Sequence, residues 1–314
     1  MNTPAIQVRG LRKSYGKKVV LDDVHLTVGA GTVTALLGPN GAGKTTAVHI
    51  LATLVRPDAG TALVNGCDVV RDPGGVRAAI GLTGQFSAVD NLLTGEENLL
   101  LMARLRHLGA DRSKSRVAEL LDQFDLSDAA RKPLATYSGG MRRRLDLTMT
   151  LVSAPSVIFL DEPTTGLDPR SRHTMWEIVR SLVADGTTVL LTTQYLDEAD
   201  ELADRIAVLD GGRIVAEGTP DELKRLVPGG HIRLRFADAA ALDAAFRLLD
   251  ESARDDAGLS LTVPSDGGVG ALRTVLDRLD TASLEVDDLS IHTPDPDDVF
   301  FALTGRSDTK GTAS

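Results

Sequence analysis

The sequence has little that could cross-link the chain or anchor it in a membrane. It contains one cysteine, Cys67, so no disulfide can form within the chain. Its apolar runs, such as residues 157–160 and 188–193, are far shorter than the roughly 20 residues that a membrane-spanning helix needs. The first residues lack the basic patch, long apolar stretch and cleavage site of a signal peptide. We therefore expect a protein of the reducing cytoplasm that does not itself span a membrane.

Basic residues are also scarce, because 34 Lys and Arg face 44 Asp and Glu and the net charge is -10. That balance disfavours a nucleic-acid partner, which needs clustered basic side chains. The 314 residues exceed what one hydrophobic core usually holds, which predicts two domains. Breaker residues at 227–230 place the boundary there. We expect a main domain over 1–227 with a helical subdomain at about 88–137, a small α+β domain over 228–306, and a mobile tail at 307–314.

The pattern of apolar residues predicts an α/β fold. Residues 6–8 and 24–28 alternate as strands of an antiparallel edge, with a turn in KSYGKK between them. From about 90 to 134, leucines recur at three- and four-residue spacing, which predicts a helical insertion. The runs SVIFLD and TTVLLTT return as strands joined to helices, and a hairpin is expected around Gly211 and Gly212. Strands and helices then alternate from His231 and end in a short helix, DDVFFALTG.

A strand, VTALLG, leads into a glycine-rich loop that fits G-x-x-x-x-G-K-[ST] and opens a helix. Its glycines let successive backbone N–H groups point at a β-phosphate. Lys44 is expected to neutralise the β- and γ-phosphates, the Thr45 hydroxyl to bind Mg²⁺, and Thr46 to contact phosphate. The candidate ATP-binding residues of this loop are Gly38, Pro39, Asn40, Gly41, Ala42, Gly43, Lys44, Thr45 and Thr46.

Two carboxylates, Asp161 and Glu162, follow the apolar strand SVIFL directly. A carboxylate at the end of a buried parallel strand, beside a phosphate loop, is where a Mg²⁺ ligand or a water-holding carboxylate belongs, and we assign Asp161 as a Mg²⁺ ligand. A water facing the γ-phosphate needs a proton acceptor, so Glu162 is the candidate general base. The loop and the carboxylates together predict ATP and Mg²⁺ as ligands and a P-loop NTPase fold.

The motifs YSGGMRRRLDL, from Tyr137, and DEPTTGLDP, from Asp161, resemble the signature sequence and the catalytic strand with D-loop of ABC transporter ATPases. The resemblance covers roughly residues 5 to 225. It implies that Tyr15 stacks on adenine and that Gln85 senses Mg²⁺ and water.

The same resemblance implies that Asp168 belongs to the D-loop. It also implies a head-to-tail dimer with a second ATPase subunit, in which the signature of one subunit caps the ATP of the other through Ser138, Gly139 and Gly140. A serine before two glycines at a helix start offers a hydroxyl and open N–H groups to an anion. A solvated helix face is expected for most of the arginines at 142–144, and no catalytic role is assigned to them.

Two positions depart from the commonest pattern of that family: Met141 replaces a glutamine, and Gln194 stands where a histidine normally reaches the γ-phosphate. Glutamine carries no proton at neutral pH, but its amide can donate to a phosphate oxygen and accept from water. We assign Gln194 to catalysis beside Glu162 and Lys44, and expect slow ATP hydrolysis. A regulatory module with little turnover is the alternative that Gln194 raises.

With these departures the sequence resembles the daunorubicin- and doxorubicin-resistance subfamily of drug-efflux ATPases. That likeness implies an ATPase at the cytoplasmic face of the membrane that energises export of hydrophobic drugs or antibiotics through a separate integral membrane permease. Another substrate, such as a lipid or polysaccharide, and a non-transport ABC ATPase are the alternatives. The C-terminal domain carries no cluster of titratable residues with catalytic spacing, and we expect a dimerisation or regulatory element.

Overall fold

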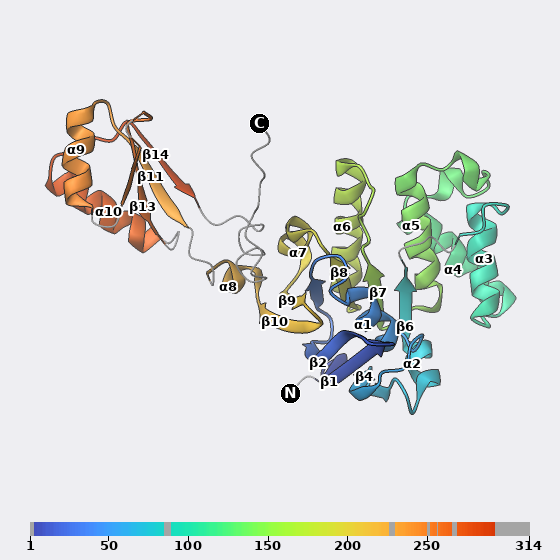
Figure 1. Ribbon diagram of the computed structural model, residues 1–314. Helices are drawn as coiled ribbons and strands as arrows, with labels where there is room; N and C mark the ends of the chain where they lie inside the picture. The colour runs from blue at the N-terminus through green and yellow to red at the C-terminus, as the bar shows by residue number, and fades with distance from the viewer. Residues whose placement is uncertain are drawn as a thin grey trace, which may run out of the picture. The chain divides into compact units, whose positions relative to one another are not determined.

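The computed structural model describes residues 3–84, 89–225, 230–249, 252–255, 257–265 and 269–292. The chain divides into two compact units, Met1–Pro220 and Asp221–Ser314 (Figure 1). The expected boundary at 227, the expected helix DDVFFALTG and the tail at 307–314 lie outside the described residues.

The first unit contains an antiparallel sheet in the order β2-β1-β4-β5. Its strands are β1 (Ile6–Tyr15), β2 (Lys18–Val28), β4 (Ala59–Val64) and β5 (Cys67–Asp68). The hairpin of β1 and β2 confirms the expected antiparallel edge. The strands run further than the sequence pattern predicts, because Lys13, Ser14 and Tyr15 still pair with β2 and leave only two residues for the turn.

The second sheet of this unit has six strands in the order β10-β9-β3-β8-β7-β6. Its strands are β3 (Val33–Leu37), β6 (Ile80–Thr83), β7 (Val157–Asp161), β8 (Thr188–Thr193), β9 (Arg205–Asp210) and β10 (Arg213–Gly218). All neighbouring pairs are parallel except β9 with β10, the hairpin expected around Gly211 and Gly212. The strands β3, β7 and β8 are buried along their whole length, as a parallel sheet covered on both faces requires.

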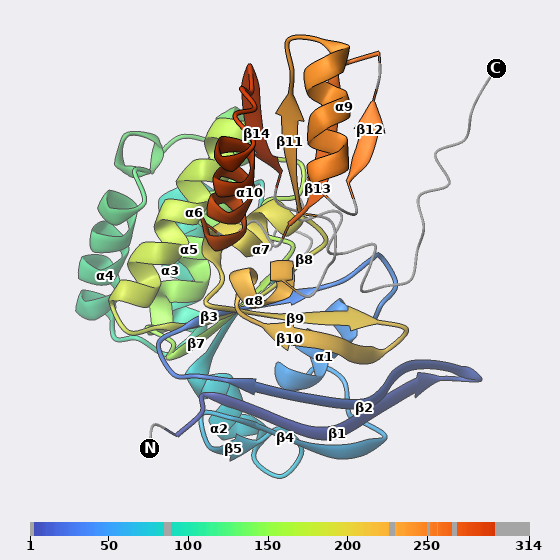
Figure 2. The ribbon, with the colours of Figure 1, turned by 90° about the vertical axis from the view of Figure 1, so that its left-hand side faces the viewer.

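Helices cover the sheets and form the expected insertion. They are α1 (Lys44–Leu51), α2 (Pro73–Ala79), α3 (Gly95–Leu105), α4 (Ala110–Gln123), α5 (Gly139–Thr150), α6 (Pro169–Ala184) and α7 (Leu196–Leu202), with 3-10 turns at Ser127–Ala129, Leu134–Thr136 and Leu151–Ser153. Helix α1 lies between the two sheets, and its apolar residues share one core with both (Figure 2). Helices α3, α4 and α5 gather beside the β6 edge (Figure 1).

The second unit begins in α8 (Pro220–Arg225) and forms a split β-α-β sheet with helices on one face (Figure 1). The strand order β12-β13-β11-β14 is antiparallel throughout. Its elements are β11 (His231–Arg235), α9 (Ala239–Leu248), β12 (Ala253–Asp255), β13 (Ser260–Pro264), α10 (Val269–Thr281) and β14 (Asp288–His292). Its own apolar core, built on Ile232, Leu234 and Phe236, explains why it is compact by itself.

Candidate functional site

The glycine-rich loop is held tightly between the end of β3 and the start of α1. The Gly38 N–H donates to the Thr193 carbonyl at 3.2 Å, and a Cβ at Gly38 would lie 2.2 Å from the Leu209 carbonyl oxygen. Gly43 has φ 111° and a Cβ there would meet the Val20 carbonyl at 2.8 Å. Both positions therefore require glycine, and the loop ends with α1 beginning at the next residue, so its N-terminal amides are free to face an anion.

Lys44 folds back over the loop in which it lies. Its side chain is 4% exposed, and its Nζ donates to the carbonyls of Gly38 at 2.7 Å and Pro39 at 3.2 Å. The Glu162 carboxylate lies 3.7 Å away. Burial lowers the pKa of Lys44, and the charges of Glu162 and Asp161 oppose that shift. The ammonium group is thus a poorly hydrated cation ready to exchange backbone carbonyls for phosphate oxygens.

Asp161 is the last residue of β7 and lies next to the phosphate loop, where it contacts Thr45. Its Oδ1 accepts hydrogen bonds from Thr192 Oγ1 at 2.5 Å and Thr45 Oγ1 at 3.3 Å. Its Oδ2 is buried and has no hydrogen-bond partner among the described residues. A buried carboxylate oxygen without a partner is costly, and a hard cation beside the Thr45 hydroxyl would satisfy it. These two side chains therefore fit a Mg²⁺ site.

Glu162 stands on a strained turn, with φ 49° in the left-handed region. Its N–H donates to both the carbonyl and the hydroxyl of Thr192 at 3.1 Å, which fixes the turn against β8. The side chain is 10% exposed, and Thr165 Oγ1 donates to its Oε2 at 3.4 Å. The carboxylate is therefore aimed from the sheet edge toward the phosphate loop.

A cavity of about 460 Å³ lies over these groups. We call it the phosphate-loop cavity, and it is lined by Tyr15, Lys18, Val20, Asn40, Gly41, Gly43, Lys44, Thr45, Thr46 and Glu162. Tyr15 is 50% exposed and presents an aromatic ring at the rim. The cavity thus offers an aromatic face, a ring of backbone amides, two lysines and one carboxylate, which suits a nucleoside triphosphate.

The candidate signature residues lie in a different hollow. Ser138 caps α5, where its Oγ accepts from the Met141 N–H at 3.2 Å. The hollow, of about 230 Å³, is lined by Asp125, Ser138, Gly140, Met141, Arg144, Arg170, Ser171 and Thr174. It shares no lining residue with the phosphate-loop cavity. One chain therefore does not bring its own signature serine to its own phosphate loop.

Asp168 is the N-cap of α6 and contacts Ser171, which lines this hollow. Its carboxylate accepts from the Ser171 N–H at 3.0 Å and hydroxyl at 2.6 Å, and these bonds lower the pKa of Asp168. A Cβ on Gly140 would lie 2.5 Å from Ser171 Oγ, so glycine is needed where α5 approaches α6. Asp168 thus fixes the serine against which the signature packs.

Gln194 is a predicted catalytic residue that does not line the phosphate-loop cavity. Gln194 follows Thr193, which pairs with Leu37 just before the phosphate loop, so Gln194 leaves the sheet at the same edge. It is half-buried and is not among the residues that line the cavity. Gln85 lies outside the described residues.

The prediction of a solvated face for the arginines after the signature is wrong for Arg143. All three are partly buried, and Arg143 donates to the backbone carbonyls of Asp161, Glu162 and Pro163. Thr192, which bonds both Asp161 and Glu162, was also missed. A polar residue inside an otherwise apolar strand was the available signal for Thr192, whereas no local signal distinguishes Arg143 from its neighbours.

Glu198 is a further carboxyl that sequence reasoning missed. It lies on α7 at 1% exposure and accepts a hydrogen bond from Thr164 Oγ1 at 2.8 Å. Burial raises its pKa, and the hydrogen bond from Thr164 opposes the shift. Glu198 therefore supports the loop that follows Glu162 through its hydrogen bond with Thr164.

We expect Glu198→Gln to change how stability depends on pH. Because the folded-state pKa is raised, the folded chain holds the proton longer than the unfolded chain, so stability falls as pH rises from the ordinary glutamate value of 4.5 through the raised pKa. Glutamine still accepts from Thr164 and does not ionise. Chemical denaturation at a series of pH values should show that the free energy of unfolding of Glu198→Gln rises relative to that of the wild type as the pH rises. Glu201→Gln, on the same helix, should show no such trend. A variant that loses stability relative to the wild type over that range contradicts this account.

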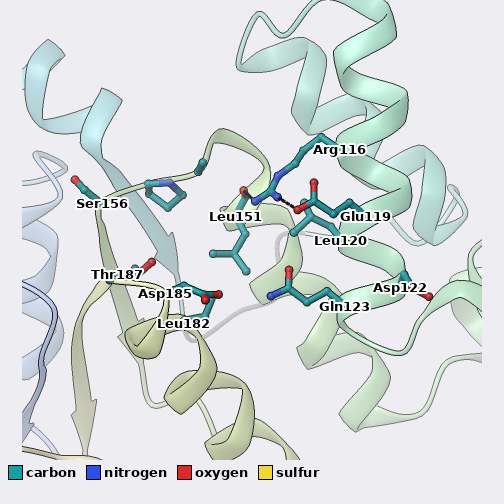
Figure 3. Close-up of a pocket in the computed structure, with 13 residues that line it drawn as sticks. Arg116, Glu119, Leu120, Asp122, Gln123, Leu151, Ser156, Leu182, Asp185 and Thr187 are labelled. Carbon is teal, nitrogen blue, oxygen red and sulfur yellow. Dashed lines mark hydrogen bonds and ion pairs between the residues drawn. The ribbon is translucent and has the colours of Figure 1, made fainter.

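A separate hollow of about 640 Å³ lies between α4 and the end of α6 (Figure 3). Arg116 donates to Glu119 Oε1 at 2.7 Å and to the Leu151 carbonyl at 3.1 Å at its wall. None of the predicted site residues lines it. The chemistry therefore gathers at the phosphate loop and not in this larger space.

Comparison with known proteins also indicates an ATP-binding protein. A family model described as ABC transporter matches residues 21–165. The daunorubicin resistance ATP-binding protein DrrA2 of Streptomyces coeruleorubidus is 52% identical over 98% of this chain and 97% of its own length. The daunorubicin/doxorubicin resistance ATP-binding protein DrrA of Streptomyces peucetius is 50% identical over 97% of this chain and 93% of its own length.

Solved structures of ATP-binding proteins also resemble this chain over 68–71% of its length. The ATP-binding subunit of an ABC transporter is 31% identical with a TM-score of 0.64, covering 71% of this chain and 93% of that chain. An ATP-binding cassette solved as a dimer in a post-hydrolysis state with ADP and Pi is 25% identical with a TM-score of 0.63, covering 68% of this chain and 98% of that chain. The chain belongs to the ABC transporter ATP-binding proteins and, within them, to the daunorubicin- and doxorubicin-resistance group.

Proposed function

We propose that this chain hydrolyses Mg-ATP and that the hydrolysis drives export of hydrophobic drugs or antibiotics through a separate membrane permease. The observation that carries the proposal is the convergence of Lys44 and Glu162 at one cavity, with Asp161 hydrogen-bonded to Thr45 in its wall, in a chain half identical to drug-resistance ATP-binding proteins over nearly its full length. The phosphate loop supplies the amides and Lys44 supplies the charge for the β- and γ-phosphates. Tyr15 at the rim stacks on the adenine ring.

Each site residue has a separate role in the proposed hydrolysis of ATP. Asp161, Thr45 and Gln85 would hold Mg²⁺, which would supply positive charge against the phosphates. Glu162, held by Thr192, accepts the proton of the attacking water. Lys44 stabilises the charge that accumulates on the phosphate oxygens. We also assign Gln194, which follows the last residue of β8, to ATP hydrolysis.

Gln194 is expected to contact the γ-phosphate and the attacking water. Its amide offers a donor and an acceptor, and it does not titrate near neutral pH. Gln194→Ala should lower ATP turnover by about 10-fold or more, and Gln194→His should restore it. Initial rates of phosphate release from pH 6 to 9 would also reveal a new ionisation near the ordinary histidine pKa of about 6.5 in the histidine variant alone. Unchanged turnover in Gln194→Ala would remove Gln194 from the site.

The separation of the two hollows supports a head-to-tail dimer. Because Ser138 and Gly140 do not line their own chain's phosphate-loop cavity, their amides and hydroxyl can serve the ATP of a second subunit. ATP would contact both subunits, whereas ADP leaves the signature face without its γ-phosphate, so hydrolysis opens the dimer.

The permease remains a separate partner in this proposal. No helix of the described part of the chain is long and apolar enough to cross a bilayer. We infer that the chain binds the permease at the cytoplasmic face of the membrane through the helical insertion and the region around Gln85, and that the C-terminal unit contributes to dimerisation or regulation.

Co-purification followed by drug-stimulated ATP hydrolysis tests the function. The full chain should bring down one integral membrane protein from its native membrane, and daunorubicin should raise the ATP turnover of that complex reconstituted in vesicles. The same complex carrying Lys44→Ala should show no stimulation. A complex whose turnover ignores daunorubicin while responding to a lipid or polysaccharide would assign a different substrate.

A further inference from the structure

Arg143 lies where the helix that begins at the signature meets the catalytic strand. It is on α5, five residues after Ser138, and its side chain is 13% exposed. The guanidinium donates to the Pro163 carbonyl at 2.8 Å and to the Asp161 and Glu162 carbonyls at 3.2 Å each. Three consecutive carbonyls on the turn that carries the candidate base are therefore held by one side chain.

The same guanidinium reaches a fourth carbonyl. Its Nη1 donates to Gly84 O at 3.0 Å, which is the residue immediately before Gln85. Asp146, one helical turn along and 3% exposed, accepts from the same nitrogen at 3.3 Å and orients the fork. Burial lowers the pKa of Arg143, and the carboxylates of Asp146, Asp161 and Glu198 oppose the shift.

The turn needs such a brace because the Glu162 backbone is in the strained left-handed region. A strained turn keeps its shape only when its surroundings fix it, and here the fixing groups come from two directions. Thr192 binds the Glu162 N–H from β8, and Arg143 binds the carbonyls from α5.

We propose that Arg143 is a positioning residue that makes the Glu162 turn move together with helix α5. The inference rests on the proposed head-to-tail dimer. When Ser138 at the start of α5 closes on the ATP of the second subunit, the same helix, through Arg143, sets Glu162 at the chain's own ATP and holds Gly84 in register with it. Closure of Ser138 on the second subunit's ATP thereby places the Glu162 base at the chain's own ATP.

Only arginine has the geometry for this contact. Its planar group offers five N–H donors in a rigid fork, whereas lysine offers a compact point charge on a flexible stem. The adjacent arginine Arg142 provides a matched contrast, because it donates to the Leu134 carbonyl and to Asn91, away from the catalytic turn, and lines neither the signature hollow nor the phosphate-loop cavity. The test therefore compares Arg143→Lys with Arg142→Lys.

Steady-state ATP hydrolysis, equilibrium ATP binding and thermal unfolding are measured on the full chain for both variants. Misplacing a catalytic group by about 1 Å costs up to about 100-fold in rate, so we expect Arg143→Lys to lower kcat by about 10- to 100-fold. The affinity for Mg-ATP should stay within about twofold, because the phosphate loop is untouched. Arg142→Lys should retain kcat within about twofold, because Arg142 contacts neither the catalytic turn nor the two hollows.

A second pair of measurements separates positioning from folding. In the Glu162→Gln background, Arg143→Lys should still form the ATP-dependent dimer, since Ser138 is unaltered. Arg143→Met removes all of the guanidinium contacts but leaves the Asp146 carboxylate buried beside an apolar side chain. If this variant does not fold, the double variant Arg143→Met with Asp146→Asn removes the carboxylate charge and should show the same loss of kcat.

The proposal is overturned if Arg143→Lys retains wild-type kcat. It is also overturned if kcat, ATP affinity, dimer formation and melting temperature fall together, since a general structural role predicts that result. A wild-type chain that neither hydrolyses ATP nor dimerises with it would instead reject the proposed function, so the two failures are distinguishable.

Discussion

Replacing Glu162 by glutamine is expected to lower ATP turnover by about 10²- to 10⁴-fold while leaving ATP bound, because the variant loses the proton acceptor but keeps the phosphate loop. The Thr192 contacts to the Glu162 N–H do not depend on the side chain, so the turn should keep its shape. Steady-state phosphate release and equilibrium ATP binding measure the two effects. The kcat should fall and the affinity should not.

The same variant should accumulate as an ATP-bound dimer, because hydrolysis no longer opens it. Size-exclusion chromatography with Mg-ATP should show a dimer for Glu162→Gln and a monomer when ADP replaces ATP. Glu177→Gln, an exposed acid on α6, is the matched control and should behave as the wild type. A Glu162→Gln chain that stays monomeric with Mg-ATP would show that the sandwich arrangement is wrong for this protein.

Replacing Lys44 by alanine is expected to abolish turnover through loss of ATP binding, with an affinity lower by about 100-fold or more. Lys44 is a buried cation whose hydrogen bonds go to loop carbonyls, and charge-assisted bonds to phosphate are the stronger alternative. Its removal takes away the only lysine within the loop at 38–46. Isothermal titration with Mg-ATP measures the loss.

Lys18 provides the control for that experiment, because it also lines the phosphate-loop cavity but is exposed on β2. Lys18→Ala should change the affinity by about fivefold or less, since an exposed charge contributes up to about 1 kcal/mol. Equal losses in the two variants would mean that Lys44 acts only as general positive charge, and would remove its specific role.

Sequence patterns predicted the parts of the fold and site that depend on local chemistry. The phosphate loop is local, because the glycines at Gly38 and Gly43 and the lysine act within one strand-loop-helix segment. Asp161 and Glu162 were found because they end a fully buried apolar strand. Strand β12 was missed because it has only three residues and is exposed throughout, so it leaves no apolar alternation to detect.

The contacts between distant segments could not be predicted in the same way. A run of three arginines has the pattern of a solvated helix face, and only the packing of α5 on the end of β7 shows that Arg143 is enclosed by carbonyls. Glu198 is likewise one of several acids in LDEADE, and only the register of α7 buries it against Thr164. These residues support the catalytic turn through tertiary contacts, which a single sequence does not encode locally.

The most direct test of the central claim is phosphate release from Mg-ATP by the purified full chain, alone and with its co-purified membrane protein. The account predicts release above that of the Lys44→Ala chain measured side by side, and a rate at the level of that control for Glu162→Gln. Release that is equal in the wild-type and Lys44→Ala chains under both conditions would contradict it.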